Sequence, residues 1–460
     1  MGFHIHHHTP HHEASEEKYI RLTQTPVPKL IIRLGLPTIA SMLITSIYNM
    51  ADTYFVGTLG KSASGAIGIV FSLMAVFQAV GFTFGQGSGA NISQKLGQKD
   101  TETATKIASV GFWSAFLTGC ILGTIGLIFL EPLVLLLGST ETILPYAKDY
   151  ARFILIACPF FTTSCVLNNI LRYEGMAVFS MIGLGLGGIL NMILDPIFIL
   201  GLHLGTAGAG LATGLSQIIS FSILLYMFLS GRTESKIRFR IFIQNIPVLK
   251  PILSTGFPAL LRQGLGSLSG LFLNHQAAIY GDAAVAAMSI VNRITQFVFS
   301  VGIGIGQGFQ PVAAFNYGAK KYSRVKKGFW FTAAAGEALI GALALLCFIF
   351  SPTLARLFQP DETVVAIVVP ALRIHCIGCL FLPFSTSGNM MFQSTGLAGK
   401  SAVLSALRSG LCFIPLVLIL PVFFDLTGIQ LAQPIADLVT FIVSLPMVLR
   451  FLRSLPKDEM

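Results

Sequence analysis

The stretch 183–213 contains a lone aspartate among apolar residues, with no lysine or arginine within helical reach of it. Asp195 follows Asn191 by four residues, so both side chains fall on one face of a helix. Pro196 has no N–H to donate to the carbonyl of Met192, which leaves a backbone oxygen free on that face. A carboxylate, an amide oxygen and a spare carbonyl form a site for a proton or a small hard cation.

Two further polar residues lie at a matching depth. Asp52 lies about six residues before its apolar stretch ends, Asp195 about seven before the end of its own, and Thr213 about seven after the next stretch begins. At about 1.5 Å per residue, all three lie roughly 10 Å below the same membrane surface. We therefore expect one ion site for H+ or Na+, formed by Asp52, Asn191, Asp195 and Thr213.

Ion exchange is the expected role of this site. An ionised carboxylate inside a bilayer costs about 2.5–3.5 kcal/mol, and two neighbouring carboxylates titrate as a pair. A Na+ ion or a cationic solute that binds there displaces the proton, which is the simplest coupling for an antiporter. The alternative is that both aspartates make static hydrogen bonds that hold helices together.

The composition predicts an all-α integral membrane protein. Of the 460 residues, 53% are hydrophobic and 11% are charged, a balance unlike that of water-soluble proteins. Apolar stretches of about 20 residues or more, the length of a membrane-spanning helix, recur along the chain. Twelve such helices are expected, at 34–58, 65–94, 106–130, 144–171, 178–202, 206–230, 250–279, 285–315, 326–352, 365–393, 400–424 and 428–453.

An internal repeat divides these helices into two six-helix bundles. Pro37 and Pro258 are 221 positions apart, and the same offset aligns Gly60 with Gly281, Gly85-Gln86-Gly87 with Gly306-Gln307-Gly308, Arg152 with Arg373, Asn168 with Asn389, and Gly175 with Gly396. One offset that holds over many positions indicates duplication. Because each half has an even number of helices, both enter the membrane from the same side, which predicts parallel repeats with a cavity between them.

The duplication places the acids in the first bundle alone. The position equivalent to Asp52 is Leu273, and the region equivalent to Asp195 lies near Leu416, so ion coupling is expected only in the first half. Candidates for the substrate cavity are Asn49, Arg262, Gln263 and Asn292. Arg262 is alternatively a structural ion-pair partner, as is Arg293.

Five segments make up the predicted domain organisation: a polar, histidine-rich tail at 1–28, an N-lobe at 29–231, a cytoplasmic linker at 232–247, a C-lobe at 248–455 and a tail at 456–460. The histidine-rich tail is interpreted as a disordered or artificially added end, with a metal-binding tail as the alternative. Most of the 30 lysines and arginines lie near the amino terminus, in the linker and in loops of the same side. This asymmetry predicts that both termini are cytoplasmic.

The sequence contains no motif of an enzyme or a nucleotide-driven pump. P-loop, HExxH, GxSxG and paired zinc-ligand patterns are missing, so we expect no enzyme and no cofactor besides the coupling ion. The net charge of +10 follows membrane topology and predicts no nucleic-acid partner. The seven cysteines, including Cys376 and Cys379 in a CxxC, lie in apolar segments and are interpreted as small hydrophobic residues.

The chain resembles the multidrug and toxic compound extrusion (MATE) transporters, most closely their bacterial multidrug-exporter branch. The resemblance covers both halves and rests on four groups of residues: Pro37 with Asn49-Met-Ala-Asp52-Thr-Tyr-Phe-Val-Gly57, Gly85-Gln86-Gly87, Asn191-x3-Asp195-Pro196 with Gly208-Ala-Gly-Leu-Ala-Thr213, and Pro258-x4-Gln263-Gly264. It implies two six-helix lobes, an outward-facing cleft, and alternating-access export of organic, often cationic, compounds in exchange for H+ or Na+.

The resemblance also implies a monomer in the inner membrane of a bacterium and an ion site that matches Asp52, Asn191, Asp195 and Thr213. One departure concerns the second lobe: some members carry essential acids in helices 7 and 10, whereas this chain has Gln263-Gly-Leu-Gly-Ser267 in helix 7 and no Asp or Glu at 365–393. A lipid-linked saccharide flippase of the same superfamily is the alternative function, and its cleft is expected to be cationic to hold phosphates.

Overall fold

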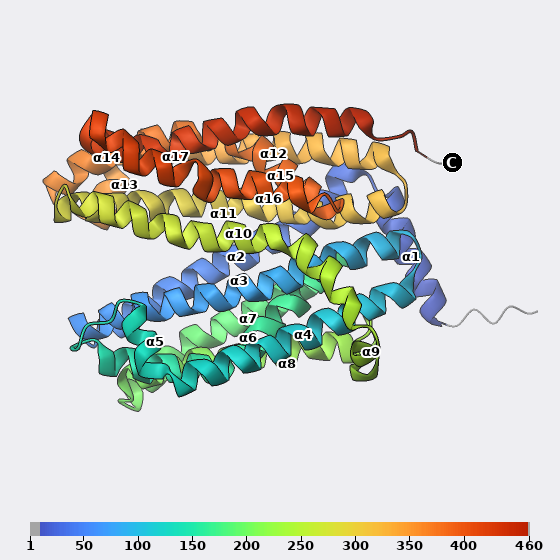
Figure 1. Ribbon diagram of the computed structural model, residues 1–460, viewed down its shortest axis with the longest axis horizontal. Helices are drawn as coiled ribbons and strands as arrows, with labels where there is room; N and C mark the ends of the chain where they lie inside the picture. The colour runs from blue at the N-terminus through green and yellow to red at the C-terminus, as the bar shows by residue number, and fades with distance from the viewer. Residues whose placement is uncertain (1–9, 459–460) are drawn as a thin grey trace, which may run out of the picture.

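The computed structural model describes residues 10–458, which form helices and turns without any strand (Figure 1). The long helices of the first half are α2 (Val27–Gly57), α3 (Lys61–Gly97), α4 (Thr101–Ile128), α6 (Leu144–Tyr173), α7 (Ala177–Pro196) and α8 (Gly205–Leu229). Those of the second half are α10 (Leu249–Ala278), α11 (Asp282–Gly318), α12 (Tyr322–Ile349), α14 (Glu362–Cys379) with α15 (Leu382–Ser394), α16 (Ala398–Ala406) and α17 (Phe413–Ser454).

Short helices fill the connections between the long ones. α1 (Pro10–Gln24) precedes the first long helix, and α9 (Phe239–Gln244) and η2 (Ile246–Val248) lie in the linker between the halves. α5 (Leu130–Leu136) and α13 (Ser351–Phe358) follow α4 and α12 at equivalent places. Two π-helical turns, η1 (Ile197–Gly201) and η3 (Leu407–Leu411), continue α7 and α16.

Ten helical segments of the described chain are long and apolar enough to cross a membrane. α10 is not among them, because Arg262, Gln263 and His275 interrupt its apolar sequence. Its length and its place in the bundle nevertheless match those of the other spanning helices (Figure 1).

One of the ten segments, Ala398–Ser454, contains two crossings. Its 57 residues exceed twice the roughly 20 residues that one crossing needs. Asp425 leaves the helical conformation with φ 50°, and a side chain at Gly428 would collide with the backbone of Leu420. Residues eight positions apart meet in this way only where the chain turns back, so the predicted twelve crossings are confirmed.

The two halves form two lobes with the same internal geometry. In Figure 1, α2 to α8 form one lobe and α10 to α17 the other. The 221-residue offset relates the bounds of α3 and α4 to those of α11 and α12. It also relates residues with positive φ: Gly60 (115°) to Gly281 (100°), Lys99 (61°) to Lys320 (58°) and Gly175 (79°) to Gly396 (82°). Backbone turns as unusual as these confirm the duplication.

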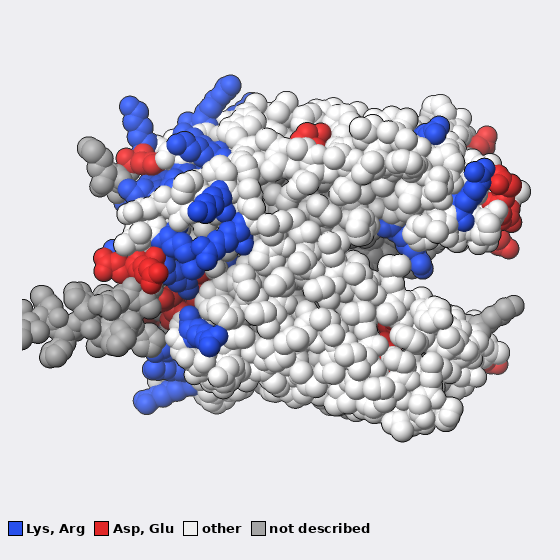
Figure 2. Space-filling view, turned by 180° about the vertical axis from the view of Figure 1, so that it is seen from behind, with Lys and Arg blue, Asp and Glu red and all other residues white. Residues whose placement is uncertain are grey.

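Basic side chains gather at one end of the molecule, which we call the basic end. It carries α1, α9 and the carboxyl-terminal end of α17, and the surface between it and the opposite end is nearly free of charge (Figures 1 and 2). Exposed leucines, isoleucines and phenylalanines are frequent on this uncharged surface. The surface pattern is that of a protein crossing a bilayer.

Within the segment expected as a polar tail, residues 10–24 form α1, which packs against both lobes at the basic end. Leu22 is fully buried, and its carbonyl accepts hydrogen bonds from Asn316 (3.1 Å) and Arg324 (3.2 Å) of the second lobe. Lys18 pairs with Glu174 of the first lobe at 2.9 Å. Glu174 also accepts backbone N–H bonds from the linker. His4, His6, His7 and His8 lie outside the described residues.

Glycines allow the lobes to touch backbone to backbone in the half of the membrane nearest the basic end. A side chain at Gly87 of α3 would collide with the carbonyl of Ile252 in α10, and one at Gly256 of α10 would collide with the carbonyl of Thr83 in α3. Gly97 and Gly318 make equivalent contacts between α3 and α11. These contacts join the two lobes at the basic end.

We predict that Gly256→Ala destabilises the protein, because the added methyl group has no space between α10 and α3. Overpacking of this kind costs about 1–3 kcal/mol. The measurement is the thermal unfolding midpoint of the purified protein in detergent micelles. Gly264→Ala in the same helix is the matched control, because nothing lies within 4 Å of its added methyl group and alanine favours a helix over glycine. A Gly256→Ala protein as stable as Gly264→Ala would contradict the prediction.

Candidate functional site

Four polar residues of the first lobe lie together inside it, and we call them the N-lobe cluster. Asp52 comes from α2, Asn191 and Asp195 from successive turns of α7, and Thr213 from α8. All four are buried, with at most 3% of each residue exposed. Asn191 Nδ2 donates to Thr213 Oγ1 at 3.1 Å, and the Asp52 and Asp195 carboxylates are close enough for their charges to interact. The structure thus brings together the residues that sequence analysis selected.

Tyr150 of α6 belongs to the same cluster and was missed in the sequence. Its hydroxyl donates to Asp52 Oδ2 at 2.6 Å and lies near Thr213. Tyr150 is fully buried. A comparison of the two halves could have identified Tyr150, because the equivalent residue of the second half, 221 positions later, is Ala371. Tyr150, like the two aspartates, is a polar residue that only the first half possesses.

Close helix packing sets the positions of these side chains. Gly210 of α8 lies so near α6 that a methyl group there would be 2.7 Å from the carbonyl oxygen of Tyr150. At the other end of α7, Ser220 of α8 donates to the Gly183 carbonyl at 2.9 Å. α7 ends at Pro196, the residue after Asp195, and the π-helical turn η1 follows from Ile197. Proline cannot donate the N–H that would extend a regular helix, which accounts for the break at this point.

Several buried oxygens of the cluster have no hydrogen-bond partner among the described residues. They are Asp52 Oδ1, Asn191 Oδ1 and both carboxylate oxygens of Asp195. A buried acceptor without a donor is costly, and an ionised carboxylate can only accept. A small hard cation between the oxygens satisfies them, since such cations prefer oxygen ligands. A proton on one carboxyl group removes one charge and supplies one donor to a neighbouring oxygen. The residues therefore fit H+ or Na+, whereas no group of three or more His, Cys, Asp or Glu suited to a metal occurs in the described chain.

A cavity of about 610 Å³ lies between the lobes beside this cluster, and we call it the cleft. Figure 2 shows that the molecule is hollowed between the lobes at the end opposite the basic end. Of the residues predicted for the cavity, Asn49, Arg262 and Gln263 line it. Asn292 is exposed and is not among the lining residues.

Two members of the N-lobe cluster, Asn191 and Thr213, also line the cleft. Asp52 and Asp195 do not, so the carboxylates lie one layer behind the wall. An ion bound at the carboxylates would therefore contact side chains that form the wall itself.

Arginine and glutamine side chains link the lobes across the closed end of the cleft. Arg262 of α10 donates to Gln86 Oε1 of α3 at 3.0 Å, and Gln263 donates to Gln78 Oε1 at 3.0 Å. Arg172 of α6 donates to the carbonyl of Gln307 in α11 at 2.9 Å. Arg262 thus has no carboxylate partner among the described residues. The structural ion pair that the sequence offered as its alternative role is not formed there.

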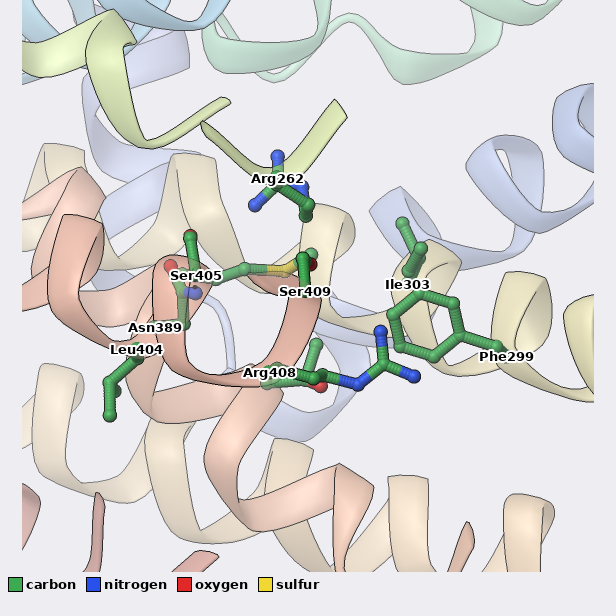
Figure 3. Close-up of a pocket in the computed structure, with 10 residues that line it drawn as sticks. Arg262, Phe299, Ile303, Asn389, Leu404, Ser405, Arg408 and Ser409 are labelled. Carbon is green, nitrogen blue, oxygen red and sulfur yellow. Dashed lines mark hydrogen bonds between the residues drawn. The ribbon is translucent and has the colours of Figure 1, made fainter. Parts of the chain in front are cut away.

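The second lobe holds one buried ion pair near the cleft. Asp437 of α17 lies 3.0 Å from Arg408 Nε and accepts a hydrogen bond from Gln433 at 2.9 Å. Figure 3 shows the Arg408 guanidinium beside the Phe299 ring, below Ser409.

Cys376 and Cys379 are both buried free thiols.

Comparison with known proteins supports a single family. The MatE family model matches the chain twice, at residues 37–197 and 258–419. The multidrug export protein MepA of Staphylococcus haemolyticus (strain JCSC1435) is 28% identical over 452 residues, which cover 96% of this chain and 98% of that protein. MepA of Staphylococcus aureus (strain MRSA252) is 28% identical over 427 residues, 92% of this chain and 93% of that protein.

Two solved structures resemble the fold closely. One is an outward-facing conformation of a multidrug resistance MATE family transporter of the MOP superfamily, with a TM-score of 0.90 and 27% identity over 95% of this chain and 99% of that one. The other is a MOP superfamily transporter from Pyrococcus furiosus Vc1 (DSM3638), in which a binding pocket of reverse polarity suggests a different function, with the same score, identity and coverage. Because the family model matches both halves, the chain belongs to the MatE family of multidrug and toxic compound extrusion transporters, which are membrane transporters.

Proposed function

We propose that the protein is a secondary active multidrug exporter that exchanges small organic compounds for H+ or Na+ across the inner membrane of a bacterium. The observation that carries this proposal is the N-lobe cluster, where two buried carboxylates with unpartnered oxygens lie directly behind the cleft. The multidrug export proteins similar to this chain support export of organic compounds. One chain contains both lobes and the whole cleft, so a monomer suffices.

The cleft has the size and lining of a site for drug-sized molecules. Its volume of about 610 Å³ lies within the usual range of ligand pockets, about 300–1,000 Å³. Aromatic rings, amides and hydroxyls line it together, including Tyr48, Phe82 and Phe161. Such a mixture accepts varied compounds by stacking and by hydrogen bonds with no single fixed shape.

Coupling runs through the residues that the N-lobe cluster shares with the cleft wall. When an ion or a proton binds between Asp52 and Asp195, Asn191 Oδ1 can turn to it, and the bond from Asn191 to Thr213 is disturbed. Both side chains face the cleft, so the wall changes shape with the charge behind it. Substrate and ion are then bound preferentially by different states, which is the requirement for exchange.

The direction of transport follows from the charge distribution. The positive-inside rule places the basic end in the cytoplasm, together with α1 and the linker. The cleft is closed at that end by the glycine contacts and hollowed at the other. The structure is then outward-facing, the state in which a compound leaves and an ion enters.

A lipid-linked saccharide flippase is not favoured as the function. Arginines in the cleft are the one observation that agrees with it. Two relatives that are similar over nearly the whole chain are multidrug export proteins. The buried carboxylates of the first lobe, which a flippase does not need for phosphate binding, also count against it.

We predict that Asp52→Asn and Asp195→Asn each lower gradient-driven efflux about tenfold or more, because the neutral amides cannot exchange an ion. Efflux of a fluorescent organic compound is measured in proteoliposomes under an imposed pH gradient and, separately, under a Na+ gradient. The gradient that drives wild-type efflux identifies the coupling ion. Asp149→Asn, an exposed acid next to Tyr150, is the matched control. Unchanged efflux in both cluster variants under both gradients would disprove the coupling role.

Tyr150→Phe is predicted to change the ion dependence of export. The phenol is the only described donor to Asp52, and a hydrogen bond to a charged group contributes about 1.5–3 kcal/mol. Its loss changes the ion concentration for half-maximal export about tenfold or more. The measurement is the initial efflux rate over a series of Na+ concentrations or pH values. Tyr146→Phe, one turn earlier and exposed, serves as the control, and identical ion curves for the two variants would refute the role of Tyr150.

A further inference from the structure

The cleft carries positive charge that no carboxylate balances. Its lining includes Arg172, Arg262 and Arg408, and no Asp or Glu occurs among the lining residues of the described chain. Arg408 is balanced by Asp437, 3.0 Å away. Arg172 and Arg262 donate hydrogen bonds only to neutral oxygens, and Arg172 also lies over the Tyr173 ring.

The two unbalanced arginines differ in the donors they leave free. Arg172 is 2% exposed and donates to the Gln307 carbonyl, Gln310 Oε1 and Asn169 Oδ1, at 2.9, 2.9 and 2.6 Å. Arg262 makes one bond, to Gln86 Oε1, and its other N–H groups have no partner among the described residues. Arg172 is thus a fixed charge in the wall, whereas Arg262 is a charge with donors available to a ligand.

Both charges act on the same part of the cleft. Both arginines line the cavity, and their hydrogen-bond partners are neighbours. Gln86, the partner of Arg262, follows Gly85, where an added side chain would collide with Asn169, a partner of Arg172. Like charges near each other in a site of low polarity are costly unless an anion lies between or beside them. Figure 3 shows Arg262 above Ser405 and Ser409, and all three residues line a small pocket at this place.

We propose that the closed end of the cleft is an anion subsite, in which Arg262 binds a carboxylate or similar group of the exported compound and Arg172 adds a fixed positive charge. A guanidinium with free donors binds a carboxylate through two parallel hydrogen bonds. The aromatic rings of Tyr48, Phe82 and Phe161 in the same lining receive the apolar part of the compound. The substrate class is therefore aromatic organic anions and zwitterions. This inference rests on the proposed export function.

The charge of the cleft departs from what the family resemblance implies for substrates that are often cationic. A cation in this cleft finds aromatic faces and amide oxygens but no carboxylate among the lining residues, since Asp52 and Asp195 lie behind the wall. It also meets repulsion from Arg262. An anion is instead attracted by Arg262 and meets no carboxylate among the lining residues that would repel it.

The test compares two dyes that share a xanthene core: fluorescein, which is anionic, and rhodamine 6G, which is cationic. Binding to the purified protein in micelles is measured by fluorescence polarisation, and export is measured in proteoliposomes of phosphatidylcholine. We expect wild type to bind and export fluorescein. Arg262→Gln is expected to weaken fluorescein binding about tenfold or more and to leave rhodamine binding unchanged or stronger.

Two further variants separate charge from structure. Glutamine at 262 can still donate to Gln86 but has no charge, whereas Arg262→Lys keeps the charge, so retained fluorescein binding in Arg262→Lys supports the subsite. Arg293→Gln, an exposed arginine of α11 outside the lining, is the control. Equal losses for both dyes in Arg262→Gln would make Arg262 a mere link between lobes and overturn the inference.

Remaining outcomes are equally decisive. Wild type that binds rhodamine but not fluorescein overturns the anion subsite and leaves export intact. Wild type that exports neither dye under any gradient contradicts the export function. The anion subsite is then still tested by whether fluorescein binds to wild type and is lost in Arg262→Gln. If phosphatidylglycerol added to the micelles displaces fluorescein from wild type but not from Arg262→Lys, the variant that still binds the dye, the arginine serves a lipid headgroup and the inference fails.

Discussion

The cost of burying two carboxylates in an apolar lobe is the constraint on which this structure depends. Asp52 has one donor, Tyr150, and Asp195 has none among the described residues. A helical bundle that only needed stability would replace such groups with apolar side chains, as the second lobe does with Leu273 and Leu416. The first lobe therefore holds a site that a mobile charge must complete, and the second lobe shows the same fold without it.

The closed end of the cleft depends on a second constraint, the fit between the lobes. Gly87 and Gly256 bring α3 and α10 into backbone contact, and α1 binds both lobes from outside through Leu22 and Lys18. Contacts of this kind are made or broken as a whole, because packed surfaces have few intermediate arrangements. A small change at the N-lobe cluster can thus be converted into a movement of entire lobes.

Periodicity, composition and duplication predicted most of this fold, since each crossing must bury its backbone in apolar sequence. The aspartates were predictable because charge is rare in such segments. Tyr150 was not, because a tyrosine near a helix end is ordinary until its hydroxyl is seen on Asp52. Asn292 was placed in the cavity lining by sequence and lies outside it, since the direction of a side chain depends on helix rotation. The helix α1 could not be predicted, because its polar residues are stabilised by contacts with residues far away in the chain, such as Glu174.

The separation of the two charged regions determines how exchange can work. If the substrate is an anion held by Arg262, its charge attracts a cation at Asp52 and Asp195, and direct electrostatics then favours joint occupancy over exchange. Exclusion must instead come from shape, through Asn191 and Thr213, which belong to the cluster and to the wall alike. In such a mechanism the ion does not compete with the substrate for any oxygen. The bound ion instead stabilises a shape of the cleft wall, and a corresponding arrangement of the lobes, that the substrate does not fit.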